Sequence, residues 1–352
     1  MADKTFLSLV MPVHNGTEWI GATLESLIGQ ADEIEIILID SSPGDATAGI
    51  AEGFADRLPI RMLRRPDVGP WQTKTNMGIE LASADHVCIL HQDDLWLPGR
   101  VEAVRRWIVQ APEAVLHLAP TLVIDRNGRA MGRWRCPLPA GKLLETEFLL
   151  KRLLVQNFVS MPAPVFRRSA WLDCGGMDEA LWYTPDWDIW VKLASAGPVV
   201  YHDEMTTAFR VHGSSQTVTG SRDARDFRAQ METVLDRYLE RIPAKSRPKV
   251  ERLGRASIEV NVSLAAASGG SARALASAAG NLLSLGPVGM GRYLRDSRLG
   301  ERVASRLRAR MAGAFWWTII RMRARRAGIS AAFTRIPGTF REWNSPVSRI
   351  PA

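Results

Sequence analysis

The stretch IEIILIDSSPGD at residues 34–45 joins a short apolar run to an aspartate and a turn-forming segment. Three more apolar runs of similar length flank it, at residues 6–13, 60–63 and 86–90. The segments between these runs have helical patterns; residues 18–28, for example, place four apolar side chains on one face. The alternation of strands and helices predicts an α/β fold whose mostly parallel, Rossmann-like sheet has right-handed crossovers.

Farther along the chain, the order of the predicted elements changes. Residues 98–110 have a helical pattern, and residues 114–125 have the pattern of a strand. The pair Asn127-Gly128 favours a tight turn, so we expect a second strand near 129–135 to close a small hairpin. Another strand is expected at 162–166, a helix at 186–196, and one or two short strands at 199–211. The Arg- and Ala-rich remainder is expected to be mostly helical.

Charge divides the 352-residue chain into two parts. Residues 1–220 contain 20 Lys and Arg against 27 Asp and Glu, a net charge of −7, whereas residues 221–352 contain 25 against 10, a net charge of +15. Length and charge together predict an α/β domain over residues 1–220 and a helical, basic C-terminal extension over residues 221–352. Nucleic acid, anionic lipid and an acidic protein are all conceivable partners for such an extension.

The three cysteines, Cys88, Cys136 and Cys174, are scattered and form no CxxC pair or Cys/His cluster. This pattern disfavours a disulfide framework and a zinc site, so a reducing compartment fits best. The first residues lack the features of a signal peptide, and no stretch reaches the roughly 18 apolar residues that a membrane span needs. We therefore expect a cytoplasmic protein.

Polar residues follow the predicted strands where each strand ends. His14 and Asn15 come directly after the first strand, Asp40 ends the second, and Asp93 and Asp94 follow the fourth. Ligands of open α/β sheets bind beyond the carboxyl ends of the strands, and carboxylates there hold Mg²⁺ or Mn²⁺, which neutralises a diphosphate. The sequence therefore predicts a site for a nucleoside diphosphate at this edge of the sheet.

Seven short segments occur along the chain in this order: PVHN, IDSSPGDAT, TNMGIELA, HQDDLWLP, CGGMDE, TPDWDIWVKLA and FRVHGSSQT. Each is weak alone, but together, over about residues 5–217, they resemble the family-2 inverting glycosyltransferases with the GT-A fold. The resemblance implies a hexosyltransferase-type enzyme that uses a UDP-, GDP- or dTDP-sugar and Mn²⁺ or Mg²⁺. It also implies an acceptor hydroxyl on a glycan or a lipid-linked acceptor, in polysaccharide, lipopolysaccharide or glycolipid assembly.

The same resemblance suggests which residues bind the donor. Asp40 corresponds to the aspartate that contacts the base or ribose, and Asp93 to the acidic motif that binds the metal. Asp94 beside it and His212 are further candidate metal ligands. The residues expected to bind the donor nucleotide are Pro12, His14, Asn15, Asp40, Lys74, Asn76 and Asp93.

On the acceptor side, the resemblance makes Asp186 the general base and puts Gly175 and Gly176 near the acceptor. The side chains of Trp182 and Trp187 are candidates to stack on sugar rings. Trp187 and Trp190 are three residues apart, however, so core packing is the alternative for this pair.

Several observations keep other interpretations open. His91 and Pro185 stand where the family commonly has Asp and Glu, which leaves an inactive glycosyltransferase-like scaffold as an alternative. Asp40 could cap a turn, Asp93 and Asp94 could be solvated loop residues, and Asp186 could complement a helix dipole. A nucleotidyltransferase is a further alternative, although PVHNGTEW after the first strand lacks the Lys or Arg of a basic phosphate loop.

Residues 298–326 contain nine arginines and a single acid, Glu301. Phe315, Trp316, Ile319 and Ile320 fall on one helical face of this segment. An amphipathic helix of this kind could dock the enzyme on an anionic membrane surface, at the cytoplasmic face. The alternative is that its Trp-rich face packs on the catalytic domain. Nucleic-acid binding is disfavoured, because the segment carries no recognisable binding module.

Overall fold

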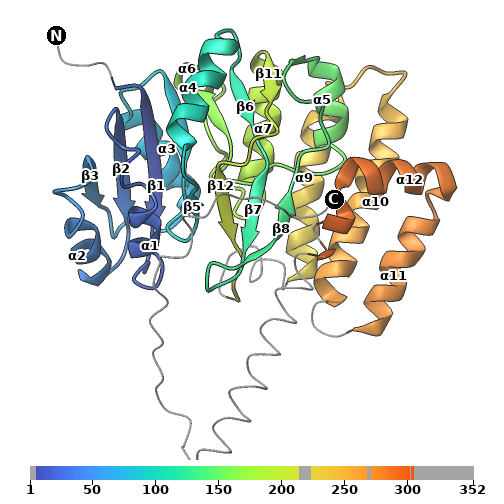
Figure 1. The fold of residues 1–352 in the computed structure, drawn as a ribbon. Coiled ribbons are helices and arrows are strands. Elements are labelled where there is room, and N and C mark those ends of the chain that lie inside the picture. Colours follow the sequence, from blue (N-terminus) through green and yellow to red (C-terminus); the bar gives the residue numbers. More distant parts are fainter. Residues whose placement is uncertain (1–4, 214–222, 268–270, 302, 305–352) are drawn as a thin grey trace, which may run out of the picture. The chain divides into compact units, whose positions relative to one another are not determined.

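The computed structural model describes residues 5–213, 223–267, 271–301 and 303–304. Its larger sheet has eight strands in the order β3-β2-β1-β4-β10-β6-β11-β9 (Figure 1). The strands are β1 (Leu7–Val13), β2 (Ile34–Asp40), β3 (Ile60–Arg64), β4 (His86–Ile89), β6 (Leu116–Leu118), β9 (Leu143–Leu144), β10 (Val165–Arg167) and β11 (Val199–Tyr201). Strands β1 to β4 pair in parallel, whereas β10 is antiparallel to both of its neighbours. The predicted α/β fold with a mostly parallel sheet is confirmed.

Helices cover both faces of this sheet because its central strands are apolar on both sides. Leu9 and Met11 of β1 pack in one hydrophobic cluster, whereas Val10 between them packs in the other. The first cluster includes residues of α1 (Ile20–Glu25), α2 (Ala46–Glu52) and α4 (Arg100–Gln110). The second includes residues of α3 (Trp71–Leu81), α5 (Thr146–Leu153), α6 (Arg168–Asp173) and α7 (Pro185–Ala196).

A smaller, four-stranded sheet has the order β5-β12-β7-β8. Its strands are β5 (Leu95–Trp96), β7 (Thr121–Ile124), β8 (Ala130–Trp134) and β12 (Thr207–Arg210). The predicted hairpin is confirmed: β7 and β8 are antiparallel, and Gly128 has a φ of +81° in the turn. The expectation of one strand over residues 114–125 is wrong. Pro120 interrupts that run, because proline has no N–H for a strand ladder, and β6 and β7 join different sheets.

Four helices follow the sheets in the described part of the extension: α9 (Ala224–Leu239), α10 (Arg247–Ala267), α11 (Ala272–Leu283) and α12 (Gly286–Ser297) (Figure 1). Apolar residues of α9 and α10 belong to the same hydrophobic cluster as α5 and α7. Gly254 allows α10 to lie close to α9 and to the backbone at Leu154. A Cβ at Gly254 would lie 2.9 Å from Leu235 and 3.0 Å from the Leu154 carbonyl oxygen. The helical character predicted for this part is confirmed, and a division into domains at residue 220 stays a prediction.

No helix among the described residues is long and apolar enough to cross a bilayer. The predicted amphipathic segment 298–326 lies mostly outside the described residues.

Candidate functional site

The loops after β1, β2 and β4 meet at one edge of the larger sheet, which we call the carboxyl edge (residues 14–15, 41–42 and 91–94). Parallel pairing sets Val13 beside Asp40, so the residues after each strand are neighbours. The Gln92 side chain accepts from the backbone N–H of His14 at 2.8 Å and donates to its carbonyl oxygen at 3.0 Å. The backbone N–H of Asn15 donates to Ser42 Oγ at 2.8 Å. These bonds hold the three loops together.

Asp40 is completely buried at the end of β2. Its Oδ1 accepts from the backbone N–H of Ser42 at 2.8 Å and from Ser42 Oγ, while Oδ2 lies 3.3 Å from Arg64 Nε. The turn-capping alternative for Asp40 is therefore realised in the structure. The carboxylate shapes the loop through Ser42, and its part in nucleotide binding stays a prediction.

Lys74 reaches the carboxyl edge from α3 and is almost fully buried. Its Nζ donates to the Val13 carbonyl oxygen at 2.9 Å and to Ser41 Oγ at 2.7 Å. Burial lowers the pKa of Lys74 to about 8, although the Asp40 carboxylate raises it. His14 Nδ1 lies 3.0 Å from the same Ser41 Oγ, so the predicted donor residues Lys74 and His14 share one partner. Pro12 is buried within β1 beneath them.

An acidic cluster follows β4. One potential ligand atom from each of His91, Asp93 and Asp94 lies within 4.8 Å of the others. His212 joins the cluster from the end of β12, with its Nε2 2.8 Å from Asp93 Oδ2. The predicted metal residues Asp93, Asp94 and His212 are thus brought together, although 119 positions separate Asp93 from His212.

Arg210, which the sequence argument missed, fixes this cluster. Its backbone N–H donates to Asp94 Oδ1 at 2.9 Å and its Nε to the Asp93 carbonyl oxygen at 2.7 Å. Burial, with the nearby Asp93 charge, raises the pKa of Asp94 well above its usual range. Burial would also raise the pKa of Asp93, but the hydrogen bond with His212 and the neighbouring His91 lower it overall.

Two atoms of the cluster suit a bound cation. Asp94 Oδ2 and His91 Nε2 are buried and have no hydrogen-bond partner among the described residues. A buried carboxylate oxygen without a donor is costly, and a divalent ion would remove that cost. Imidazole nitrogen and carboxylate oxygen together form a donor set that Mn²⁺ accepts.

Asp186 lies in the first turn of α7, after Pro185 at the helix start. Its Oδ2 accepts from Asn157 Nδ2 at 2.9 Å, and its Oδ1 accepts from the backbone N–H of Trp187 at 2.7 Å. Burial raises the pKa of Asp186 to about 6, while these two hydrogen bonds lower it. Asn157 is held in turn by the Val159 N–H, which donates to its Oδ1 at 3.1 Å. Nothing in the apolar sequence around Asn157 marks it as a partner of Asp186.

Asp188, two residues later, has different surroundings. Its Oδ1 accepts from Arg237 and from the Tyr238 hydroxyl, each at 2.7 Å, and its Oδ2 lies 3.0 Å from Lys192 Nζ. These four residues, Asp188, Lys192, Arg237 and Tyr238, form what we call the helical junction between α7 and α9. Asp188 is therefore a structural residue that ties the extension to the α/β part.

Asn76 of α3 is hydrogen-bonded to the turn that contains Gly175 and Gly176. The Asn76 amide exchanges two hydrogen bonds with the Met177 backbone, each 2.9 Å long. Gly176 has a φ of +64°, and a Cβ there would lie 2.6 Å from Asn76 Oδ1. Gly175 also has a positive φ, of +78°. Both glycines thus suit a tight turn against α3, which gives them a structural role, and the Asn76 amide is already hydrogen-bonded to this turn.

The two tryptophans proposed to stack on sugars differ. Trp187 is only 4% exposed, and its Nε1 donates to the Leu153 carbonyl oxygen at 2.7 Å. Its ring packs in the larger hydrophobic cluster, so the core-packing alternative applies to Trp187, and the residue is too buried to stack on a sugar ring. Trp182 is partly exposed, and its Nε1 donates to Asp226 Oδ2 of α9 at 2.7 Å.

Comparison with known proteins gives consistent matches. Residues 8–170 match the family described as Glycosyl transferase family 2. An uncharacterised glycosyltransferase of Rickettsia typhi is 24% identical over 229 residues, which cover 63% of this chain and 69% of the relative. An uncharacterised protein of Mycobacterium tuberculosis is 27% identical over 209 residues, covering 56% and 65%. The chain thus spans about two thirds of the length of these relatives.

Among solved structures, a mannosyltransferase from Pyrobaculum calidifontis, determined in complex with GDP-Man and Mn²⁺, aligns with a TM-score of 0.50. The sequences are 14% identical, and the alignment covers 86% of each chain. At this identity the likeness concerns the fold.

Proposed function

Because residues 8–170 match glycosyl transferase family 2, we propose that the chain is a member of this family with the GT-A fold, and that it transfers a sugar from a nucleoside-diphosphate sugar to an acceptor hydroxyl with inversion. The observation that carries the proposal is the acidic cluster at the carboxyl edge. Three ligand-bearing side chains from one loop and His212 from the smaller sheet converge there. A buried polar cluster with unsatisfied atoms is expected where a charged ligand binds.

Asp93, Asp94, His212 and His91 are the residues that we propose to hold Mn²⁺ or Mg²⁺. When bound there, the ion supplies positive charge that neutralises the donor diphosphate as it leaves. The Mn²⁺ and GDP-Man in the Pyrobaculum mannosyltransferase support this choice of ion and donor class. The nucleoside half of the donor is proposed to meet the carboxyl edge around His14, Asn15, Asp40 and Lys74.

Asp186 is the proposed general base. It takes the proton of the acceptor hydroxyl as that oxygen bonds to the anomeric carbon and the bond to the donor phosphate oxygen breaks. A pKa of about 6 keeps the carboxylate ionised at neutral pH yet able to accept a proton. The hydrogen bond from Asn157 orients it. One direct displacement without a protein nucleophile inverts the anomeric carbon.

For the acceptor, we propose a glycan or lipid-linked molecule of polysaccharide, lipopolysaccharide or glycolipid assembly. We propose that Trp182 and the turn at Gly175 and Gly176 lie beside the acceptor. We also propose that the transferred sugar is a hexose. Cytoplasmic location and membrane docking through residues 298–326 also remain proposals.

A thermal-shift series on the full chain would test the donor class. We expect one of UDP, GDP or dTDP to raise the melting temperature only with Mn²⁺, according to concentration over affinity. Incubation with the matching nucleotide sugar should then release free sugar slowly. A nucleotidyltransferase would instead release pyrophosphate from a nucleoside triphosphate and a sugar phosphate. Binding without hydrolysis or transfer would favour the inactive scaffold.

A further inference from the structure

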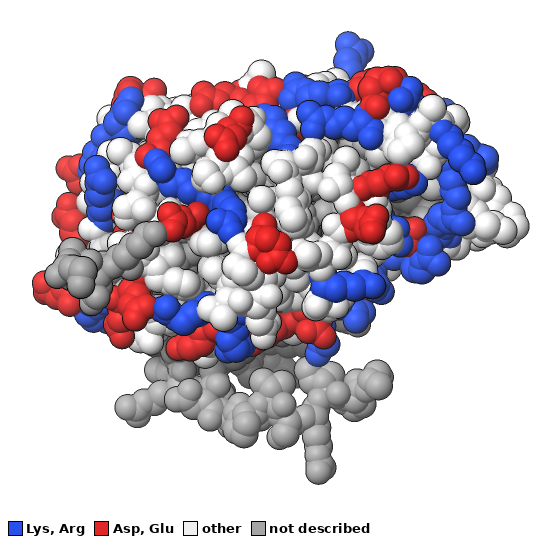
Figure 2. All heavy atoms as spheres, turned by 90° about the horizontal axis from the view of Figure 1, so that it is seen from above, with Lys and Arg blue, Asp and Glu red and all other residues white. Residues whose placement is uncertain are grey.

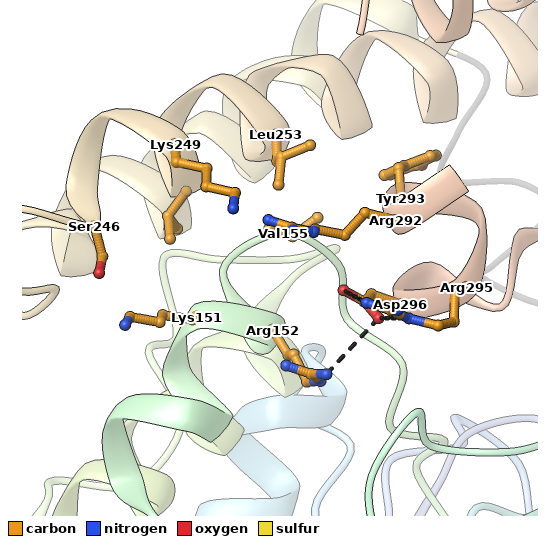
Figure 3. A pocket seen from close by; sticks show the side chains of 11 residues that line it. Lys151, Arg152, Val155, Ser246, Lys249, Leu253, Arg292, Tyr293, Arg295 and Asp296 are labelled. Atoms are coloured by element: carbon orange, nitrogen blue, oxygen red, sulfur yellow. Dashed lines mark hydrogen bonds and ion pairs between the residues drawn. The ribbon is translucent and has the colours of Figure 1, made fainter. Parts of the chain in front are cut away.

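A cavity of about 280 Å³ is bordered by α5, α10 and α12 (Figure 3). It is separate from the carboxyl edge and from the proposed base. Five cationic side chains line it, together with a single acid: Lys151, Arg152, Lys249, Arg292, Arg295 and Asp296. In Figure 3, Lys249 and Arg292 point toward one another above the loop that contains Val155. The cavity therefore brings cations from three helices to one place.

The cations outnumber the carboxylates that neutralise them. Asp296 forms ion pairs with two arginines: its Oδ1 lies 3.8 Å from Arg152 and 2.8 Å from Arg295. Lys151 pairs with Glu147 on its own helix. Lys249 and Arg292 have no ion-pair partner among the described residues. Five cations against these two carboxylates leave an excess of three positive charges.

This excess of positive charge affects Arg152, which is partly buried. Burial lowers the pKa of Arg152, Asp296 raises it, and the neighbouring Arg295 and Arg292 lower it further. Like charges that repel at a site of reduced solvent exposure favour binding of an anion. Seen from above, Lys and Arg side chains also form a band on the side where the C-terminal helices lie (Figure 2). The field around the cavity therefore attracts negative charge.

The lining also includes four apolar or aromatic side chains, Val155, Val250, Leu253 and Tyr293. The Tyr293 hydroxyl lies 3.2 Å from Ser257 Oγ and the ring is fully buried. The cavity volume lies just below the range of about 300–1,000 Å³ that ligand pockets span, so a small group fits and a complete nucleotide sugar does not.

We propose that this cavity is a binding site for a phosphate or pyrophosphate group, carried by a soluble molecule or by a lipid head group. Guanidinium groups present several N–H donors in a fork that matches phosphate oxygens, and three arginines border this cavity. Val155 is two residues before Asn157, which holds Asp186, so the site adjoins the segment that orients the proposed base. Anion binding at this cavity requires no transferase activity.

Calorimetric titration of the full chain with sodium pyrophosphate, in EDTA, tests the soluble source. EDTA prevents binding that depends on a metal at the acidic cluster. We expect one site whose affinity falls about tenfold in Arg292→Gln, because a charge-assisted hydrogen bond is lost. Arg255→Gln is the matched control, since Arg255 lies on α10 and pairs with Asp236 and Glu251. That variant should bind pyrophosphate like the wild type.

Co-sedimentation with phosphatidylglycerol or phosphatidylcholine vesicles tests the lipid source in the same variants. If Arg292→Gln weakens binding only to the phosphatidylglycerol vesicles and pyrophosphate does not bind, the phosphate is that of a lipid. Loss of pyrophosphate binding in that variant supports the soluble source. If Arg292→Gln and Arg255→Gln match the wild type in both assays, the proposed site does not exist. Circular dichroism of each variant verifies that it is folded.

Discussion

Asp94 at the carboxyl edge and Asp188 at the helical junction are both fully buried, yet their oxygen atoms are satisfied very differently. Asp188 has a cation beside each oxygen, from Arg237 and Lys192, and a hydroxyl from Tyr238. Asp94 receives one backbone hydrogen bond, and its Oδ2 has no donor among the described residues. A buried carboxylate with its own partners stabilises a fold, whereas one left incomplete is suited to a ligand.

The same contrast distinguishes Asp186 from Asp188, which differ by two positions in one helical turn. Asp186 has neutral partners only, Asn157 and the Trp187 N–H, and burial raises its pKa to about 6. A carboxylate that is paired with cations has a lowered pKa and accepts a proton less readily. The partners therefore favour Asp186 over Asp188 as the candidate base.

The largest effect is expected from Asp93→Asn. Loss of a metal ligand removes charge stabilisation of the leaving group worth several kcal/mol, so turnover should fall by about 10³-fold or more. The measurement is sugar transfer or donor hydrolysis with Mn²⁺, alongside nucleotide-induced thermal shift. Asp67→Asn, an exposed acid paired with Arg65, is the control that should leave both unchanged. Wild-type turnover in Asp93→Asn would remove the acidic cluster from the mechanism.

Asp186→Asn should lower kcat by about 10²–10⁴-fold, the usual value of general-base catalysis. Affinity for the donor nucleotide should stay within about twofold, because Asp186 is proposed to contact the acceptor and not the donor. Steady-state kinetics and nucleotide titration measure the two quantities. An active Asp186→Asn enzyme, with kcat lost in folded Asp188→Asn, would reverse the roles that their partners suggest.

Asp188→Asn should act on stability. The substitution removes the carboxylate that lies beside Lys192 and one of the two that pair with Arg237, the other being Asp178, and the free energy of unfolding should fall by about 3 kcal/mol. Urea denaturation measures it. Asp236→Asn breaks an exposed pair with Arg255 between α9 and α10, and should change the free energy by less than about 1 kcal/mol. Equal effects of the two substitutions would mean that the helical junction is no more than a surface ion pair.

The smallest effect is a dependence of kcat on pH. Because the pKa of Asp186 is about 6, kcat should fall about tenfold per pH unit below that value and level off above it. Stability runs the other way: the folded-state pKa is raised, so the contribution of protonated Asp186 is lost as pH rises from about 4 to about 6. Asp186→Asn should remove both dependences. A flat kcat profile from pH 5 to 8 in the wild type would contradict the assignment.

The alternation of apolar runs and helical patterns was enough to predict β1 to β4 and the helices between them, because buried parallel strands have a strong local signature. The break at Pro120 was missed, since the choice between two sheets depends on distant partners. In the acidic cluster, motif order suggested Asp93 with His212, whereas Arg210 and Asn157 act only through contacts that span 116 and 29 positions. The burial of Trp187 has the same origin, because it depends on how α7 packs against α5.

The hydrophobic cluster that α5 and α7 share with α9 and α10 has a consequence for synthesis on the ribosome. The carboxyl edge and α7 leave the exit tunnel before α9 and α10, whose apolar residues complete the packing around α7. Until those helices emerge, the nascent chain exposes apolar surface that chaperones bind. We therefore expect the proposed base to reach its native surroundings only after α10 has left the tunnel, so premature termination upstream of α10 would yield an aggregation-prone product.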